Sequence, residues 1–91
     1  MSPADGVPKL APGVRLTFDR RRDCWLLQAP ERVVLLDEIG AAILQKIDGT
    51  TPIAGIIAAL ARDYEAGEDE IAGDIAELLA DLTGRGLLVV N

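Results

Sequence analysis

The sequence predicts a single α+β domain in which a three-stranded antiparallel sheet is followed by three helices. Residues 14–36 contain three short apolar stretches separated by turn residues, which is typical of strands joined in a meander. From residue 37 onwards the apolar residues recur with helical spacing. A chain of 91 residues has room for one domain. We therefore expect an extended lead-in over residues 1–13 and one domain over residues 14–91.

Each strand has its own pattern. Residues 14–19 alternate, with Val14, Leu16 and Phe18 on one face, as in a half-solvated strand. Residues 24–28 form the second strand and begin at Cys24 and Trp25, which we interpret as core or boundary residues. The turn between the two strands contains three consecutive arginines, residues 20–22. We interpret this turn as solvated, and docking onto an acidic partner is the alternative.

The third strand, residues 32–36, is apolar on both faces. Four apolar residues in a row follow Arg32, and such a run predicts that both faces of the strand are covered. A chain of this length has little material for covering both sides of a sheet. Either the strand is central in a compact core, or a molecule outside this chain lies against it. The second alternative makes the protein a binding module.

The helices are delimited by caps and glycines. Asp37 is a good N-cap for the first helix, which ends near Asp48-Gly49, and Thr51-Pro52 precedes the second. The third helix covers residues 68–83, and residues 87–90 form an extended tail or short strand. The apolar stripe of the second helix predicts a buried face that includes Tyr64; its members are Ile53, Ile56, Ile57, Leu60 and Tyr64.

The third helix has two further stripes beside its core face. One is acidic and the other is made of small residues, whereas Ile71, Ile75, Leu78, Leu79 and Leu82 form the core face. The acidic stripe is Glu70, Asp74, Glu77 and Asp81, and the small stripe is Ala72, Gly73, Ala76 and Ala80. A solvated helix face accounts for both. The alternative is a groove in which an extended peptide pairs with the third strand and rests on the small stripe. An exposed apolar strand edge also favours a homodimer.

Composition and charge exclude several functions. The chain has no histidine, a single cysteine (Cys24) and a single serine (Ser2), so we expect no intrachain disulfide, metal site, cofactor or catalysis. Residues 47–91 carry two basic and nine acidic residues, which argues against nucleic-acid binding. No membrane span or signal peptide is visible, so we expect a cytoplasmic protein without membrane contact.

Short motifs over residues 10–88 resemble the PqqD family of peptide chaperones in pyrroloquinoline quinone (PQQ) biosynthesis. They are Leu10-Ala11-Pro12-Gly13-Val14-Arg15-Leu16, Pro30-Glu31, Leu36, Ile43-Leu44, Asp48-Gly49-Thr50, the stripe of the second helix, Asp74-Ile75 and Gly86-Leu87-Leu88. The resemblance implies a winged-helix-like fold shared with the recognition elements of ribosomally made peptides (RiPP recognition elements). It also implies binding of the precursor peptide PqqA and its presentation to the radical SAM enzyme PqqE, which cross-links a glutamate to a tyrosine.

The resemblance also places a peptide site on this chain. Family members bind the peptide as an added strand between the third strand and the third helix. The implied peptide-binding residues are Arg32, Val33, Val34, Leu35 and Leu36 on the strand, and Ile71, Ala72, Ile75, Ala76 and Leu79 on the helix. The alternatives are a homodimerising domain without peptide binding and a winged-helix nucleic-acid binder. The second alternative lacks support, because residues 68–83 contain no Lys or Arg.

Overall fold

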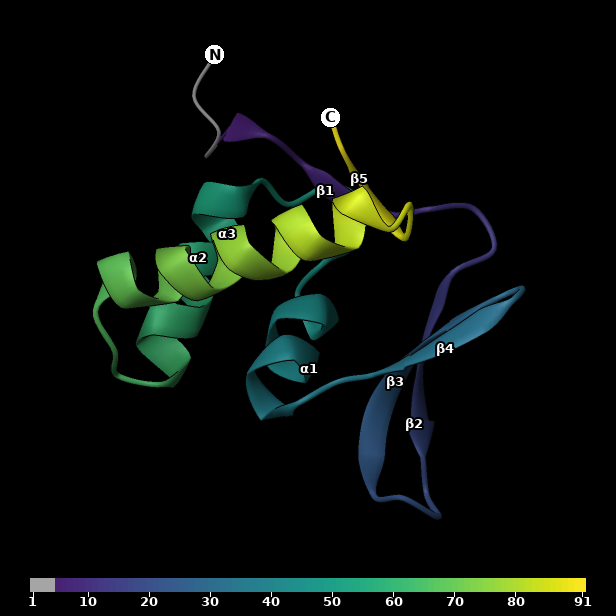
Figure 1. Cartoon of the computed structure of the whole chain (residues 1–91). Coiled ribbons are helices and arrows are strands. Elements are labelled where there is room, and N and C mark those ends of the chain that lie inside the picture. The colour runs from purple at the N-terminus through teal and green to yellow at the C-terminus, as the bar shows by residue number, and fades with distance from the viewer. Residues whose placement is uncertain (1–4) are drawn as a thin grey trace.

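The computed structural model describes residues 5–91 and confirms the predicted α+β architecture (Figure 1). Three antiparallel strands precede three helices, and a further strand lies near each end of the chain. The elements are β1 (Pro8–Leu10), β2 (Arg15–Asp19), β3 (Cys24–Ala29), β4 (Arg32–Leu35), α1 (Glu38–Gln45), α2 (Ile53–Asp63), α3 (Glu68–Gly84) and β5 (Leu88–Val90). The first four residues of the expected lead-in lie outside the described part of the chain.

The main sheet has the strand order β2-β3-β4. Phe18 pairs with Trp25 across β2 and β3, and Ala29 pairs with Arg32 across the two-residue turn between β3 and β4. Both connections are short, so consecutive strands become neighbours in space. The sheet stands to one side of the three helices, and β4 runs directly into α1 (Figure 1).

A second, two-stranded sheet joins the two ends of the chain. Pro8, Lys9 and Leu10 of β1 pair with β5, and Val7 and Asn91 exchange backbone hydrogen bonds of 2.8 and 3.0 Å. The N–H of Ile53 donates to the carbonyl of Gly6, which attaches this segment to the start of α2. The sequence predicts an extended conformation for residues 8–10, and the structure adds a partner strand.

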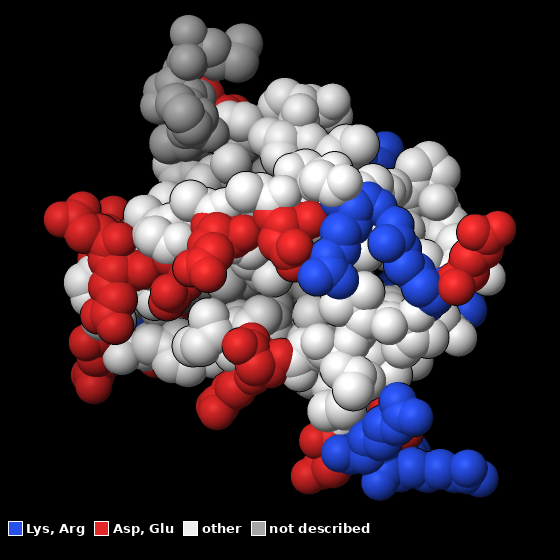
Figure 2. All heavy atoms as spheres, viewed as in Figure 1, with Lys and Arg blue, Asp and Glu red and all other residues white. Residues whose placement is uncertain are grey.

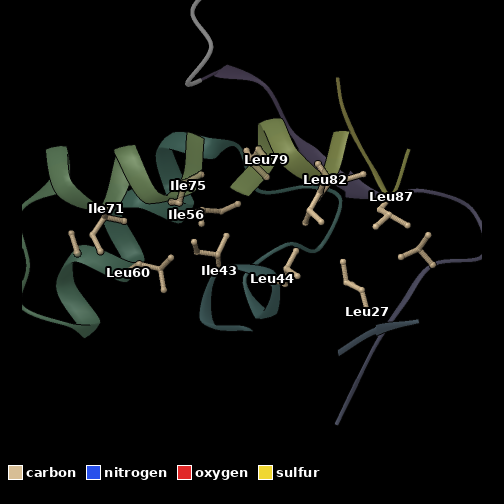
Figure 3. Close-up of a cluster of buried hydrophobic side chains, with 13 residues drawn as sticks. Leu27, Ile43, Leu44, Ile56, Leu60, Ile71, Ile75, Leu79, Leu82 and Leu87 are labelled. Atoms are coloured by element: carbon tan, nitrogen blue, oxygen red, sulfur yellow. The ribbon is translucent and has the colours of Figure 1, made fainter. Parts of the chain in front are cut away.

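The core is aliphatic and lies mainly among the three helices, with Leu27 contributed by β3 (Figure 3). Leu27 of β3, Ile56 of α2 and Ile75 and Leu82 of α3 are almost completely buried, and within residues 5–91 no charged or polar residue is buried. The aromatic residues are absent from this core. Tyr64, predicted on the buried stripe of α2, is 47% exposed, and that prediction is wrong because the residue follows the last helical turn as its C-cap.

Two carboxylates hold the start of α1 and the turn between α1 and α2. Oδ1 of Asp37 accepts the N–H of Gly40 at 2.7 Å and caps α1, as predicted. Between the two helices, Oδ1 of Asp48 accepts the backbone N–H groups of Thr50 at 2.9 Å and Thr51 at 2.8 Å. These two bonds, followed by bonds from both threonine hydroxyls, hold the pKa of Asp48 well below its usual range. The turn therefore depends on an ionised Asp48.

Candidate functional site

Among residues 5–91, β4 is an edge strand, and some of its main-chain groups have no hydrogen-bond partner. The N–H of Leu36 donates to the carbonyl of Trp25 at 3.0 Å, next to the pair formed by Leu35 and Leu26. Hydrogen bonding alternates along an antiparallel pair, so Val34 also turns its N–H and C=O towards β3. The N–H and C=O groups of Val33 and Leu35 therefore point to the open edge. Of the two alternatives for this strand, the central position is wrong, because β4 ends the sheet.

The two faces of β4 differ in what covers them. Val34 and Leu36 pack against the core, whereas Val33 is 50% exposed and Leu35 is 57% exposed. Leu26, opposite Leu35 on β3, is buried at 7% exposure, so the exposed apolar surface on this face of β4 comes from Val33 and Leu35. Large apolar side chains beside an unpaired strand edge are typical of a binding surface or an aggregation hazard. The strand thus offers both backbone groups and apolar area to another chain.

A cleft of about 460 Å³ lies between the first turns of α1 and the middle of α3. Its apolar lining is formed by Ile39, Ile43 and Leu78. Its other side chains are all acidic, and Gly40 completes the lining; the acidic members are Asp37, Asp74, Glu77 and Asp81. Figure 2 shows the acidic row along α3. Asp37, which lines the cleft, follows the last residue of β4 by two positions, so the cleft lies near the end of the open edge.

The predicted residues of α3 fall into two groups. Ile71, Ile75 and Leu79 are buried in the core, whereas Ala72 is half-buried and Ala76 is exposed. None of the five lines the cleft described above, and peptide contact with them stays a prediction. The cleft is lined by three members of the acidic stripe together with Leu78.

The cleft residues are not predicted as a site from the sequence. Leu78 was assigned to the core face, and its half-buried position shows that it lies at the border of that face. Ile39, in the first turn of α1, is 41% exposed. The sequence of α3 does contain an indication of this site. Leu78 lies at the border of the core face, next to the acidic stripe, so an apolar side chain and carboxylates are adjacent there.

The far ends of β4 and α3 are linked by arginines. The guanidinium of Arg32 donates to the carbonyl of Arg85, which is the C-cap of α3. Nε of Arg85 lies 3.1 Å from Oδ1 of Asp81, which also lines the cleft. These exposed contacts contribute little to stability. They do place the beginning of β4 beside the end of α3, so that strand and helix flank the same side of the molecule.

The candidate site consists of the open edge of β4 and the cleft between α1 and α3. Within residues 5–91 no group of three or more His, Cys, Asp or Glu side chains is arranged to hold a metal ion. Among the same residues, no helix is long and apolar enough to cross a membrane. The open edge and the cleft supply hydrogen-bonding groups and apolar surface for an extended segment.

Comparison with known proteins gives a consistent result. Residues 24–88 match the family described as "Coenzyme PQQ synthesis protein D (PqqD)". A protein named "PqqA binding protein" from Xanthomonas oryzae pv. oryzae (strain PXO99A) is 49% identical over 84 residues, which are 92% of this chain and 91% of that protein. A protein of the same name from Xanthomonas campestris pv. campestris (strain B100) is 46% identical with the same coverage.

Two solved structures are similar to the whole chain. The solution NMR structure of the PqqD truncation of Methylobacterium extorquens PqqCD, described as a functional and stand-alone RiPP recognition element, gives a TM-score of 0.83. It is 37% identical, and the match covers 98% of this chain and 94% of that one. The crystal structure of PqqD from Xanthomonas campestris is 45% identical with a TM-score of 0.60 and covers 96% of each chain.

Proposed function

This chain belongs to the PqqD family, and on that premise we propose that it binds the precursor peptide PqqA by strand addition to β4 and presents it to PqqE in PQQ biosynthesis. The observation that carries this proposal is the open edge of β4, with the main-chain groups of Val33 and Leu35 unpaired beside two exposed apolar side chains. The name and close similarity of the relatives support the peptide as the occupant.

Main-chain hydrogen bonds do not account for the affinity alone. Val33 and Leu35 offer two N–H and two C=O groups, and at about 1 kcal/mol per bond these contribute about 4 kcal/mol. Ordering five peptide residues costs roughly 5–10 kcal/mol of backbone entropy. The remainder must come from apolar burial, and the outer face of β4 and the cleft beside α3 provide it. The side chains of the protein that line the cleft therefore determine which peptide sequences bind.

The wall formed by α3 is part of this proposal. Leu78 and the acidic residues around it line the cleft, so peptide side chains that turn towards α3 are expected to be apolar, neutral or basic. Ala72 and Ala76 do not line the cleft, so they contact the peptide only if it extends beyond the cleft. The buried side chains of Ile71, Ile75 and Leu79 hold α3 against the core. Comparing the peptide affinities of Leu78→Arg and Ala76→Arg shows whether the peptide contacts the cleft or the small-residue stripe of α3.

The protein acts by positioning and performs no bond chemistry in this proposal. A bound peptide loses conformational freedom once, on the recognition element, and its effective concentration near PqqE rises when the two proteins associate. Homodimerisation through β4 is the competing function, since a second copy covers the same edge. Sedimentation measurements with and without peptide distinguish the two, because the peptide and the second copy compete for Val33 and Leu35.

The proposal is tested by titrating isotopically labelled protein with synthetic PqqA and measuring backbone amide shifts. We expect the largest shifts over residues 33–36 and at the cleft residues of α1 and α3. Leu78→Arg should weaken binding more than tenfold, and Ala76→Arg less than threefold. If Ala76→Arg has the larger effect, the peptide lies on the small-residue stripe instead. If saturating peptide leaves residues 33–36 unshifted, the strand-addition site is wrong.

A further inference from the structure

All three aromatic residues of the chain line one pocket, which shares Leu36 and Asp37 with the proposed peptide site. Phe18, Trp25 and Tyr64 come from β2, β3 and the end of α2, and they surround a hollow of about 300 Å³ whose base includes Leu36 and Ala42. Phe18 is 41% exposed and Tyr64 is 47% exposed. The rings of Phe18 and Trp25 meet edge to face, with centroids 5.3 Å apart and planes at 68°. The aromatic surface is therefore ordered and open.

The distribution of aromatic residues is opposite to that expected for a small core. Aromatic side chains bury the largest apolar area per residue, and a chain with only three of them normally uses them inside. Here the core is built entirely from aliphatic residues, and the aromatic ones gather on one surface. Tyr and Trp, together with Arg, are the residues that contribute most to binding in protein interfaces.

Arginine is supplied by the adjacent turn. Arg20, Arg21 and Arg22 connect β2 and β3 directly beyond the pair formed by Asp19 and Cys24, and Figure 2 shows the basic cluster at the tip of this hairpin. Asp19 accepts the backbone N–H of Arg21 and pairs with Arg22 at 3.8 Å. In the described part of the chain no carboxylate lies within ion-pair distance of the guanidinium groups of Arg20 or Arg21.

Three carboxylates line the aromatic pocket. Asp37 is engaged as the cap of α1, and Asp23 and Glu38 also line the pocket. Arg20 and Arg21, which have no ion-pair partner among the described residues, thus place positive charge at the hairpin tip, in a protein whose net charge is −6. A partner that contacts the tip with carboxylates and fills the aromatic pocket with an apolar side chain matches this arrangement.

The aromatic pocket and the peptide cleft lie on two sides of the first turn of α1. Asp37 lines both, while Ile39 and Ile43 face the cleft and Ala41 and Ala42 face the aromatic pocket. A protein docked on the aromatic pocket would therefore stand beside the point at which a peptide strand on β4 passes the start of α1. That position suits an enzyme that must reach residues beyond the bound segment.

We propose that Phe18, Trp25, Tyr64 and the arginine turn form the docking surface for the peptide-modifying enzyme, through an acidic patch on that enzyme around an apolar side chain. This inference rests on the proposed function, because the enzyme is the one that receives the bound peptide. It assigns a second surface to the protein, separate from the open edge of β4. The peptide and the enzyme can therefore bind in either order, because neither surface covers the other.

Affinity for purified PqqE of the source organism, measured with and without saturating PqqA, tests this assignment. Phe18→Asp and Tyr64→Asp alter exposed side chains, so circular dichroism should show an intact fold. We expect each to weaken PqqE binding more than tenfold and to change PqqA affinity less than twofold. Arg20→Glu combined with Arg21→Glu should weaken PqqE binding most at low salt. Val89→Asp, at an equally exposed apolar position on β5, is the matched control and should leave both affinities unchanged.

The outcomes separate the two proposals. If the three variants bind PqqE as tightly as the wild type does, the docking surface is wrong and the peptide function stands. If they lose PqqA and PqqE together while remaining folded, the two surfaces are one, and the inference is also overturned. If the wild-type protein binds PqqA but not PqqE, presentation and the docking surface both fail. If it does not bind PqqA, the proposed function itself fails.

Discussion

Replacing Leu35 by proline tests the open edge with little damage to the fold. The N–H of Leu35 has no partner within the sheet, and its side chain is 57% exposed. Proline is tolerated on edge strands when the lost N–H faces solvent. Peptide binding, however, loses one main-chain hydrogen bond worth about 0.5–1.5 kcal/mol, which is roughly a 2- to 10-fold loss of affinity. The pyrrolidine ring also obstructs the incoming strand, so this is a lower limit.

Two companion variants isolate the main-chain contribution. Leu35→Ala removes the side chain and keeps the N–H, so the difference between it and Leu35→Pro measures the hydrogen bond. Val34→Pro removes an N–H that faces β3, and it leaves the carbonyl of Leu27 without its partner at a cost of about 1–3 kcal/mol of folding stability. Leu35→Pro should therefore lower the affinity for the peptide, and Val34→Pro should lower the folding stability of the protein.

Fluorescence anisotropy of labelled PqqA gives the affinity, and thermal unfolding gives the stability. The expected ranking is that Leu35→Pro binds less tightly than Leu35→Ala at nearly equal melting temperature. Equal affinity of these two variants would refute the use of the Leu35 N–H. A larger loss of stability for Leu35→Pro than for Val34→Pro would refute the assignment of which groups face the open edge.

Three further predictions concern stability. Because the pKa of Asp48 is depressed in the folded state by the N–H groups of Thr50 and Thr51, its contribution is present above the usual Asp pKa of about 4 and is lost as the pH falls below it. The melting-temperature difference between the wild type and Asp48→Asn should thus shrink below about pH 4; a constant difference would contradict the linkage. Gly73→Ala should stabilise α3 by about 0.4–1 kcal/mol, because an added Cβ meets nothing within 4 Å, and a lower melting temperature would contradict this. Gly86→Ala should cost about 1 kcal/mol, since φ is +76° there, and an unchanged melting temperature would show that the turn relaxes.

The sequence predicted the order of elements well because local signals agreed. Alternation over residues 14–19, the cap at Asp37 and the glycines after α3 each mark an element that the structure confirms within about two residues. The pairing of β1 with β5 lacked such a signal. Three-residue strands from opposite ends of the chain have no periodicity to read, and their register depends on the packed helices.

The candidate site was predictable only in part. The continuous apolar run after Arg32 correctly predicted a strand, and it also predicted that both faces of that strand are covered. Within this chain one face is not covered, because Val33 and Leu35 are exposed. Which face of α3 borders the cleft depends on the rotation of that helix against α1 and α2. From the sequence alone, either Leu78 or Ala76 could line a groove. The packing of Ile71, Ile75 and Leu82 in the core fixes the rotation of α3, and with that rotation Leu78 lines the cleft.

Amide hydrogen exchange at single-residue resolution, with and without saturating PqqA, tests the central claim most directly. Val34 and Leu36 donate within the sheet and should be protected in both states, whereas Val33 and Leu35 should exchange fast in the free protein and become protected by the peptide. A complex that forms while Val33 and Leu35 continue to exchange at their free rates would contradict strand addition on β4.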